Sequence, residues 1–350
     1  MVNLFGKLAV CLFCLTGLNA SEAKPLIVTN KEIKNKDNRV LTFKWDKFRI
    51  GSAEYPQGPT GCTVISFPDR NVKAVADLRG SATGSIFTNS LVEGLTVLDC
   101  IVFTGGSLLG LESVAGINAD IFKDRNYATG WTTIPYVAGS VIFDWVNRKE
   151  HLYPDMALGS AAYRSAEAGR FILGKHGVGI NATIAKGFGP DYLQSSGQGG
   201  AVETFGDVKI AAFIVINSLG AIYDEQGKVI HGYLDRKSNQ QFTENELLKQ
   251  VYPIKPNSVK PEQKGNTTLS VIVINVDLEL DEMREIARQV HNSFSEVIRP
   301  FGTSEDGDTL YFVSTREIQM ADKDRFDAIP RLGMLATRVA KKAIYSAFDK

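Results

Sequence analysis

The chain changes character at Lys264-Gly265-Asn266-Thr267-Thr268-Leu269-Ser270-Val271-Ile272-Val273-Ile274-Asn275. The run before this point, residues 253–265, is polar and rich in proline and lysine, whereas the residues from Thr267 onward are apolar and β-branched. Such a change predicts a linker that ends where a buried strand begins. We therefore expect Thr267 at the mouth of that strand.

Thr267 is a candidate nucleophile. If the chain were cut between Asn266 and Thr267, Thr267 would carry both its hydroxyl and a free α-amine. An α-amine titrates at about 7.7–8, so it can take the proton of the hydroxyl near neutral pH without a histidine. The alternative interpretation is that Thr267 and Thr268 only open a strand after a linker.

The composition sets limits on fold and partners. The 350 residues are 44% hydrophobic, which allows a sizeable core in either two domains or one large α/β unit. Lys+Arg and Asp+Glu balance at 39 each. This balance argues against nucleic acid or an anionic membrane as a partner and favours a small or neutral one.

Residues 1–23 predict a secretory signal. Lys7 supplies the basic start, residues 8–18 form a short apolar core, and small-residue cleavage sites follow at Ala20 or Ala23. The apolar core is too short to span a membrane. We expect a periplasmic or secreted protein, with a retained amphipathic anchor as the alternative.

No cofactor or metal site is predicted. The turn Gly105-Gly106-Ser107 lies between a strand and a helix, but it lacks the lysine of a phosphate-binding loop and the Rossmann spacing. Cys62 and Cys100 are spaced too far apart for a metal site. Export would permit a disulfide between them, although buried free thiols are the commoner state of two such residues.

Periodicity and turn residues predict alternating strands and helices. We expect strands at 40–50, 62–67, 72–78, 100–104, 141–145, 199–204, 208–217, 267–275 and 310–313, the early ones in a common sheet. One helix is expected after the glycine-rich segment 105–112 and ends at about residue 122. Further helices are expected over 155–168, 243–251, 281–298 and 329–348. His291 lies outside the apolar stripe of helix 281–298, which predicts a solvated side chain.

Two further features carry polar groups near expected strand ends. Asp306 and Asp308 precede strand 310–313, and two carboxylates beside Thr267 could orient an N-terminal ammonium and relay protons. Their alternative role is a hairpin turn. Asn217 ends strand 208–217, where its amide could face a site or simply form a turn.

Several motifs agree in order and spacing with one known family. They are Gly58-Pro59-Thr60-Gly61-Cys62-Thr63-Val64, Gly105-Gly106-Ser107 with Gly110-Leu111, Tyr153-Pro154-Asp155 with Ala157-Leu158-Gly159, Asn266-Thr267-Thr268 and Asp306-Gly307-Asp308-Thr309. Together they resemble the P1 peptidase family, which includes L-aminopeptidase/D-esterases and β-aminopeptidases, over about residues 45–350. The nylon-oligomer hydrolase branch (6-aminohexanoate-oligomer endohydrolases), which has threonine after asparagine, is the closest resemblance.

The resemblance implies the fold and the processing. It implies a four-layer αββα sandwich, similar to N-terminal-nucleophile hydrolases, in one structural domain. The chain would cut itself into a larger subunit, 24–266, and a smaller one, 267–350, which stay together. It also implies a homo-oligomer of tetramer size or larger, without cofactor or metal.

The resemblance also assigns roles to residues. Thr267 would be the nucleophile and new N-terminus after cleavage at Asn266-Thr267. Asp306 and Asp308 would orient and assist it, Lys186 would act near it, and Asn217 would serve the oxyanion.

The implied function is hydrolysis of linear amides, such as 6-aminohexanoate oligomers, through an acyl-enzyme. The alternative is an aminopeptidase for peptides with β- or D-residues; an acyltransferase resembling ornithine acetyltransferases and a non-catalytic binding protein are further ones. Two features depart from the family pattern. Phe143 stands where a tyrosine is expected, and the export signal differs from the intracellular nylon-oligomer enzymes.

Overall fold

The computed structural model describes residues 39–348, apart from residues 147, 189, 236 and 252–264. The predicted signal, 1–23, and most of the predicted linker, 253–265, lie outside the described residues. Within the described part, no helix is both long and apolar enough to cross a membrane.

The first sheet has five strands in the order β12-β13-β18-β20-β4. They are β12 (Gln198–Phe205), β13 (Val208–Asn217), β18 (Thr267–Val276), β20 (Asp308–Ile318) and β4 (Lys73–Arg79). β18 and β20 are parallel to each other, and they pair antiparallel with β13 and β4 respectively. All ten residues of β18 are buried. Cover on both faces explains why this strand reads as a strongly apolar run.

The second sheet has six strands in the order β5-β7-β6-β3-β2-β8. They are β5 (Ser85–Ile86), β7 (Val137–Val141), β6 (Cys100–Thr104), β3 (Thr60–Ser66), β2 (Arg49–Tyr55) and β8 (Glu167–Ala168). Two helices, α2 (Glu112–Asp124) and α3 (Met156–Arg164), pack against one face of this sheet.

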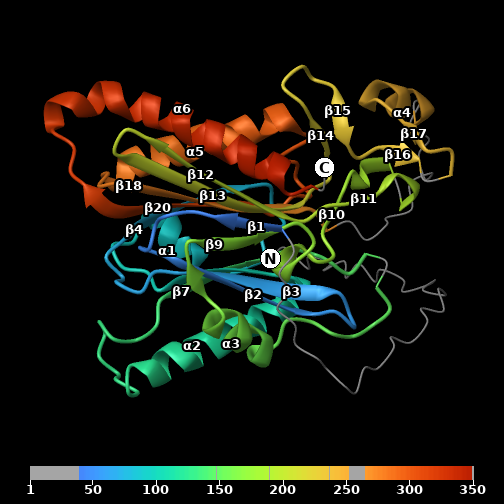
Figure 1. The fold of residues 1–350 in the computed structure, drawn as a ribbon. Coiled ribbons are helices and arrows are strands. Elements are labelled where there is room, and N and C mark those ends of the chain that lie inside the picture. The colour runs from blue at the N-terminus through green and yellow to red at the C-terminus, as the bar shows by residue number, and fades with distance from the viewer. Residues whose placement is uncertain (1–38, 147, 189, 236, 252–264, 349–350) are drawn as a thin grey trace, which may run out of the picture.

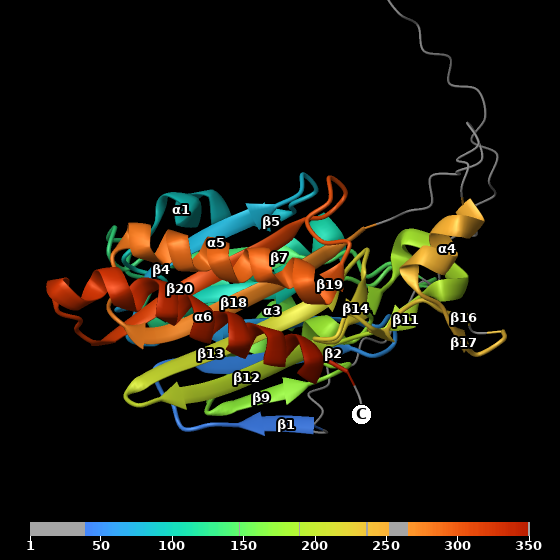
Figure 2. The ribbon, with the colours of Figure 1, turned by 90° about the horizontal axis from the view of Figure 1, so that it is seen from above.

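The two sheets face each other, and helices cover their outer faces (Figure 1). α5 (Leu280–Val297) and α6 (Asp322–Ser346) pack on the five-stranded sheet, over which they run in Figure 2. An apolar core that includes Phe103, Phe213 and Tyr311 lies between the sheets. The chain is therefore a mixed α/β protein, as predicted.

Shorter elements surround these layers. β1 (Arg39–Thr42) pairs with β9 (Arg170–Leu173), β10 (Thr183–Ile184) with β11 (Gln194–Ser195), β14 (Ala221–Tyr223) with both β15 (Val229–His231) and β19 (Ile298–Arg299), and β16 (Leu234–Asp235) with β17 (Gln240–Gln241). The remaining helices are α1 (Thr88–Glu93), α4 (Glu244–Val251) and the 3-10 turns η1 (Ser107–Leu111), η2 (Gly177–Gly179), η3 (Lys186–Phe188) and η4 (Pro190–Tyr192).

Three strand predictions need correction. The strand expected at 40–50 is two strands, β1 and β2, which lie in different sheets. β4 does not join the early sheet; it pairs antiparallel with β20 and forms one edge of the five-stranded sheet. The strand expected at 141–145 is β7, which ends at Val141; the chain then leaves the sheet because Asp144 turns toward Thr60 and the backbone of Gly106.

The prediction that His291 is solvated is wrong. The side chain is fully buried, and its Nδ1 lies 2.7 Å from a carboxylate oxygen of Asp77 in β4. Phe294 and Phe301 pack against the imidazole ring. The apolar stripe of α5 marks the centre of the face that meets the sheet. The edge strand β4 and the segment after α5 also cover the side of the helix that carries His291.

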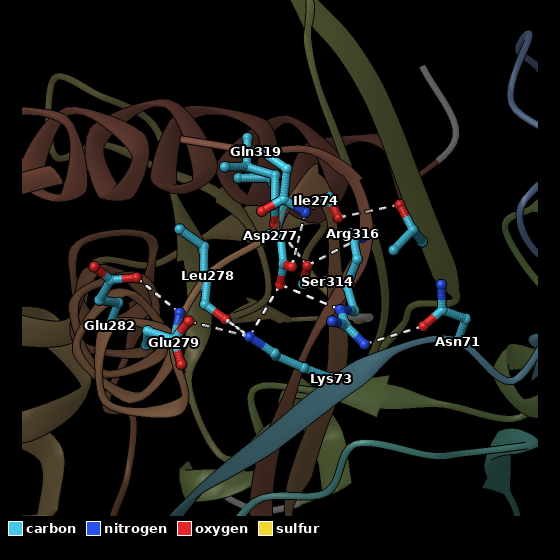
Figure 3. Close-up of polar contacts among 12 residues, drawn as sticks. Asn71, Lys73, Ile274, Asp277, Leu278, Glu279, Glu282, Ser314, Arg316 and Gln319 are labelled. Atoms are coloured by element: carbon cyan, nitrogen blue, oxygen red, sulfur yellow. Dashed lines mark hydrogen bonds and ion pairs between the residues drawn. The ribbon is translucent and has the colours of Figure 1, made fainter. Parts of the chain in front are cut away.

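The end of β18 opposite Thr267 is tied to the large N-terminal part of the chain by Lys73 of β4 (Figure 3). Its ammonium lies 3.0 Å from a carboxylate oxygen of Asp277 and donates to the carbonyl oxygen of Leu278 at 2.9 Å. Arg316 and Gln319 contact the same Asp277 carboxylate. These contacts join segments that precede and follow Thr267.

Candidate active site

Thr267 lies where three strand ends meet. It is the first residue of β18, and its register partner is Asn217, the last residue of β13. On the other side, Asn266 forms a parallel bridge with Asp306, just before β20. The β-branched residues after Thr267 favour a strand. Because this strand pairs with β13 and β20, its first residue lies beside residues that are far apart in sequence.

The Asn266 carbonyl oxygen receives two hydrogen bonds. The Thr267 hydroxyl donates to it at 2.5 Å, and the backbone N–H of Gly307 donates at 3.0 Å. The hydroxyl thus lies against the peptide bond that precedes its own residue. A backbone N–H on that carbonyl oxygen is the type of group that stabilises an oxyanion.

Gly307 is a site residue that the sequence did not reveal. A Cβ atom on it would lie 2.6 Å from the Ala82 carbonyl oxygen and 3.0 Å from the Thr267 hydroxyl oxygen. No side chain fits there without a shift of its neighbours. The available signal was a glycine between two aspartates, which composition alone cannot distinguish from a hairpin turn.

Lys186 and Asn217 both donate hydrogen bonds to the preceding carbonyl, that of Gly265. The Lys186 ammonium group donates to the Gly265 oxygen at 2.7 Å and to the Asn217 backbone oxygen at 2.7 Å. The Asn217 side-chain amide donates to the Gly265 oxygen at 3.2 Å and to the Phe143 oxygen at 3.0 Å. In the uncut chain these donors therefore contact Gly265, one residue before the carbonyl that Gly307 contacts.

The two aspartates differ in their contacts. Asp308 accepts from the backbone N–H of Thr268 at 2.6 Å and from that of Gly302 at 3.2 Å. Asp306 accepts from the backbone N–H of Thr303 at 2.7 Å and from its hydroxyl at 2.8 Å. The Asp308 carboxylate thus contacts the residue next to Thr267, whereas the Asp306 carboxylate closes a turn.

Burial shifts the pKa values of the two aspartates and of Lys186 in the direction that favours their neutral forms. It raises the pKa of Asp308 to about 8, with a further contribution from the charge of Asp306. Burial also raises the pKa of Asp306 and lowers that of Lys186 well below its ordinary value, although nearby carboxylates oppose the Lys186 shift. With a pKa of about 8, the Asp308 carboxyl can exchange a proton near physiological pH.

Asp144 supports the segment that carries Phe143. It is buried, pairs with Arg148 at 2.9 Å, and accepts from the Thr60 hydroxyl at 2.6 Å and the Gly106 backbone N–H at 2.9 Å. Asp144 was not a candidate from sequence, because it lay inside the strand expected at 141–145. The two glycine motifs that suggested the family resemblance are thus bridged by one carboxylate.

The site is closed to solvent at Asn266 and Thr267. Asn266 and Thr267 are 1% and 5% exposed. Cavities of about 300 and 330 Å³ lie elsewhere, one beside Cys100 and Tyr163 and the other beside His231 and Phe348. Among the described residues, no group of three His, Cys, Asp or Glu side chains is arranged to hold a metal ion.

Residues 47–349 match the family model described as Peptidase family S58. The chain belongs to peptidase family S58. The resemblance inferred from the motifs is thereby confirmed. This S58 member is 34% identical over 325 residues to a 6-aminohexanoate-oligomer endohydrolase of Kocuria sp. (strain KY2), covering 90% of this chain and 88% of the relative.

A second relative supports this assignment, and a solved structure shows the same fold. A 6-aminohexanoate-oligomer endohydrolase of Agromyces sp. (strain KY5R) is 34% identical over 342 residues, covering 95% of this chain and 90% of that protein. The L-aminopeptidase D-Ala-esterase/amidase of Ochrobactrum anthropi, described as a variant of the Ntn hydrolase fold, superposes with a TM-score of 0.62 at 14% identity, covering 86% of this chain and 84% of that one. The S58 protein is a hydrolase that acts on amide bonds.

Proposed function

We propose that this S58 hydrolase cuts its own chain between Asn266 and Thr267 and then uses Thr267 to hydrolyse linear amides through an acyl-enzyme. The observation that carries the proposal is the pair of hydrogen bonds on the Asn266 oxygen, one from the Thr267 hydroxyl and one from Gly307. A nucleophile and an oxyanion donor on one carbonyl are what acyl transfer requires.

Self-cleavage would proceed by transfer of the Asn266 acyl group from nitrogen to oxygen. The Thr267 oxygen adds to the Asn266 carbonyl carbon, its proton passes to a neighbouring base, and the Gly307 N–H holds the oxyanion. The bond between that carbon and the Thr267 nitrogen then breaks, and the nitrogen takes a proton. Water hydrolyses the resulting ester to an Asn266 carboxylate and a free Thr267 hydroxyl.

The mature enzyme would reuse the same groups. The Thr267 α-amine serves as base, Asp308 and Asp306 orient the ammonium form, and Lys186 and Asn217 supply donors beside the nucleophile. The fragments 24–266 and 267–350 would form one αββα sandwich. They would stay together because β18 and β20 are both paired with strands of the larger fragment, β13 and β4.

Linear amides with unbranched spacers, such as 6-aminohexanoate oligomers, are the proposed substrates, since two relatives at 34% identity are named as endohydrolases of these oligomers. We further propose that the protein is exported and works as a homo-oligomer without metal or organic cofactor. Native mass measurement should give tetramers or larger, and chelators should leave activity unchanged.

The first test is processing. Purified protein should run as two fragments on a denaturing gel, and N-terminal sequencing of the smaller one should begin Thr-Thr-Leu-Ser. Thr267→Ala should remain one folded, inactive chain. An intact wild-type chain with full activity would contradict the proposal.

The second test is the substrate. Cleaved protein is incubated with a 6-aminohexanoate oligomer and with a panel of β-, D- and α-aminoacyl amides, and products are identified by mass. Internal cuts of the oligomer support the endohydrolase. Release of N-terminal residues alone would instead assign the protein as an aminopeptidase.

A further inference from the structure

We infer that Gly265 and Asn266 occupy, before cleavage, the subsite that holds the acyl part of a substrate in the mature enzyme. The subsite takes an acyl chain that is unbranched at the Gly265 position and carries a carbonyl three bonds from the scissile carbonyl carbon. This inference rests on the proposed function and ranks its substrates: among linear amides, internal amides of N-acylated, peptide-like chains should be cut faster than 6-aminohexanoate oligomers.

The chemical basis is that the two acyl-enzymes are equivalent. During self-cleavage the Asn266 acyl group is joined to the Thr267 oxygen as an ester, and during hydrolysis a substrate acyl group is joined to the same oxygen. Both esters have their carbonyl oxygen within reach of the Gly307 N–H, which is 3.0 Å from the Asn266 oxygen. The remainder of each acyl group therefore leaves Thr267 along the same path.

The first requirement is a hydrogen-bond acceptor at the position of the Gly265 oxygen. Lys186 and the Asn217 amide both donate to this oxygen, at 2.7 and 3.2 Å, and they are only 4% and 0% exposed. Buried donors that lose their acceptor are costly, so a substrate without this carbonyl is disfavoured. A residue with a free N-terminal amine at the Asn266 position lacks that carbonyl and would bring an ammonium close to Lys186.

The second requirement is an unbranched carbon at the position of the Gly265 α-carbon. A Cβ atom added to Gly265 would lie 2.0 Å from Cβ and 2.3 Å from Cγ of Phe143. Phe143 cannot withdraw its Cβ without movement of its backbone, whose carbonyl accepts the Asn217 hydrogen bond. Phe143 is therefore a specificity-determining residue, and it excludes a side chain at this position.

The Asn266 side chain shows that the intervening position is less demanding. Its amide oxygen and nitrogen are buried without a hydrogen-bond partner among the described residues. The subsite therefore encloses the side chain at this position but makes no hydrogen bond to it. A 6-aminohexanoyl unit meets the unbranched requirement, but its next carbonyl is more distant, so it leaves the Lys186 and Asn217 donors unused.

The experiment compares p-nitroanilides on the cleaved wild-type enzyme. Acetyl-Gly-Asn anilide should have a kcat/KM at least about tenfold above acetyl-Ala-Asn anilide, which adds the excluded methyl, and above Asn anilide, which lacks the acceptor. Acetyl-6-aminohexanoyl anilide should fall below acetyl-Gly-Asn anilide. Equal rates for the Gly and Ala compounds would overturn the inference.

Two Phe143 variants make the comparison specific. In Phe143→Gly all three clashing atoms, Cβ, Cγ and Cδ1, are gone, so the Gly-to-Ala ratio should fall toward one. In Phe143→Ala the Cβ remains, so the ratio should stay high. If neither variant folds, the wild-type ratios alone decide. A protein that cuts itself and hydrolyses anilides without these preferences refutes only the subsite, whereas one that neither cuts itself nor hydrolyses any anilide refutes the proposed function.

Discussion

The backbone N–H of Gly307 lies 3.0 Å from the carbonyl oxygen of Asn266, the residue that precedes the candidate nucleophile. This hydrogen bond joins the segment before β18 to the segment before β20 at the bond proposed to break. A backbone donor is held by the sheet itself, so it needs no reorganisation when charge develops on the oxygen.

Gly307→Ala should slow self-cleavage at least about tenfold, because the added Cβ would crowd the Ala82 carbonyl and the Thr267 hydroxyl and displace the donor. The appearance of fragments after cell-free synthesis measures the rate. Gly130→Ala is the matched control, since the nearest atom to its Cβ would be a side-chain oxygen at 3.3 Å. Wild-type cleavage kinetics in Gly307→Ala would rule out this role for the donor.

Self-cleavage should accelerate as the pH is raised through about 8. Burial and the charge of Asp306 raise the pKa of Asp308 to about 8, and only its charged form can accept a proton. Asp308→Asn should cleave slowly and lose this rise. A profile with the same rise in Asp308→Asn would assign the proton acceptor elsewhere.

The same shift has a consequence for stability. A pKa that is raised in the folded state contributes stability below the unfolded value, and this contribution is lost as the pH rises through the folded value. The uncut Thr267→Ala chain should therefore lose stability between about pH 4 and pH 8. Adding Asp308→Asn should reduce that loss, as measured by the unfolding temperature across this pH range.

Lys73→Met should lower the free energy of unfolding by about 2 kcal/mol, as measured by urea unfolding. Removal of one partner from a buried pair costs about 3–5 kcal/mol, but Arg316 and Gln319 still contact Asp277 here. The control is Lys47→Met, whose pair with Asp69 is exposed and screened by solvent, so this variant should unfold like the wild type. Equal effects of the two variants would show that the Lys73 cluster adds no stability.

The thiols of Cys62 and Cys100 should not react with a thiol reagent in the folded protein without residues 1–23. Both are free and buried, and burial raises the pKa of Cys62 to about 12 and that of Cys100 well above its ordinary value. Because the thiolate is the reactive form, labelling should require denaturant. Labelling of the native protein within minutes would contradict this burial.

The local features of the chain were predictable from sequence, whereas several contacts were not. The apolar run after Thr267 predicted a buried strand, and the strands expected at 199–204 and 208–217 form as the paired strands β12 and β13. The helix expected over 243–251 also forms, and Thr243 and Glu246 make the two hydrogen bonds of a capping box, as a threonine three residues before a glutamate favours. These features depend on neighbours in sequence, which the pattern contains.

What the pattern missed depends on the packing of distant segments. His291 of helix α5 is buried because Asp77 of strand β4 and the ring of Phe301 pack against it. The Gly307 contact is made by a backbone N–H, and the identities of side chains do not predict where a backbone N–H points. The shared contact of Lys186 and Asn217 with Gly265 needs the ends of separate segments to meet, and spacing along the chain does not encode that meeting.

The position of β18 and β20 between β13 and β4 has a consequence for the lifetime of the molecule. An uncut chain finds these pairings within a single molecule, but a chain cut at Asn266 would have to find them by collision between two molecules. Unfolding of the cut protein would then depend on its concentration. After cleavage, an unfolded molecule would thus refold much less efficiently than an unfolded single chain.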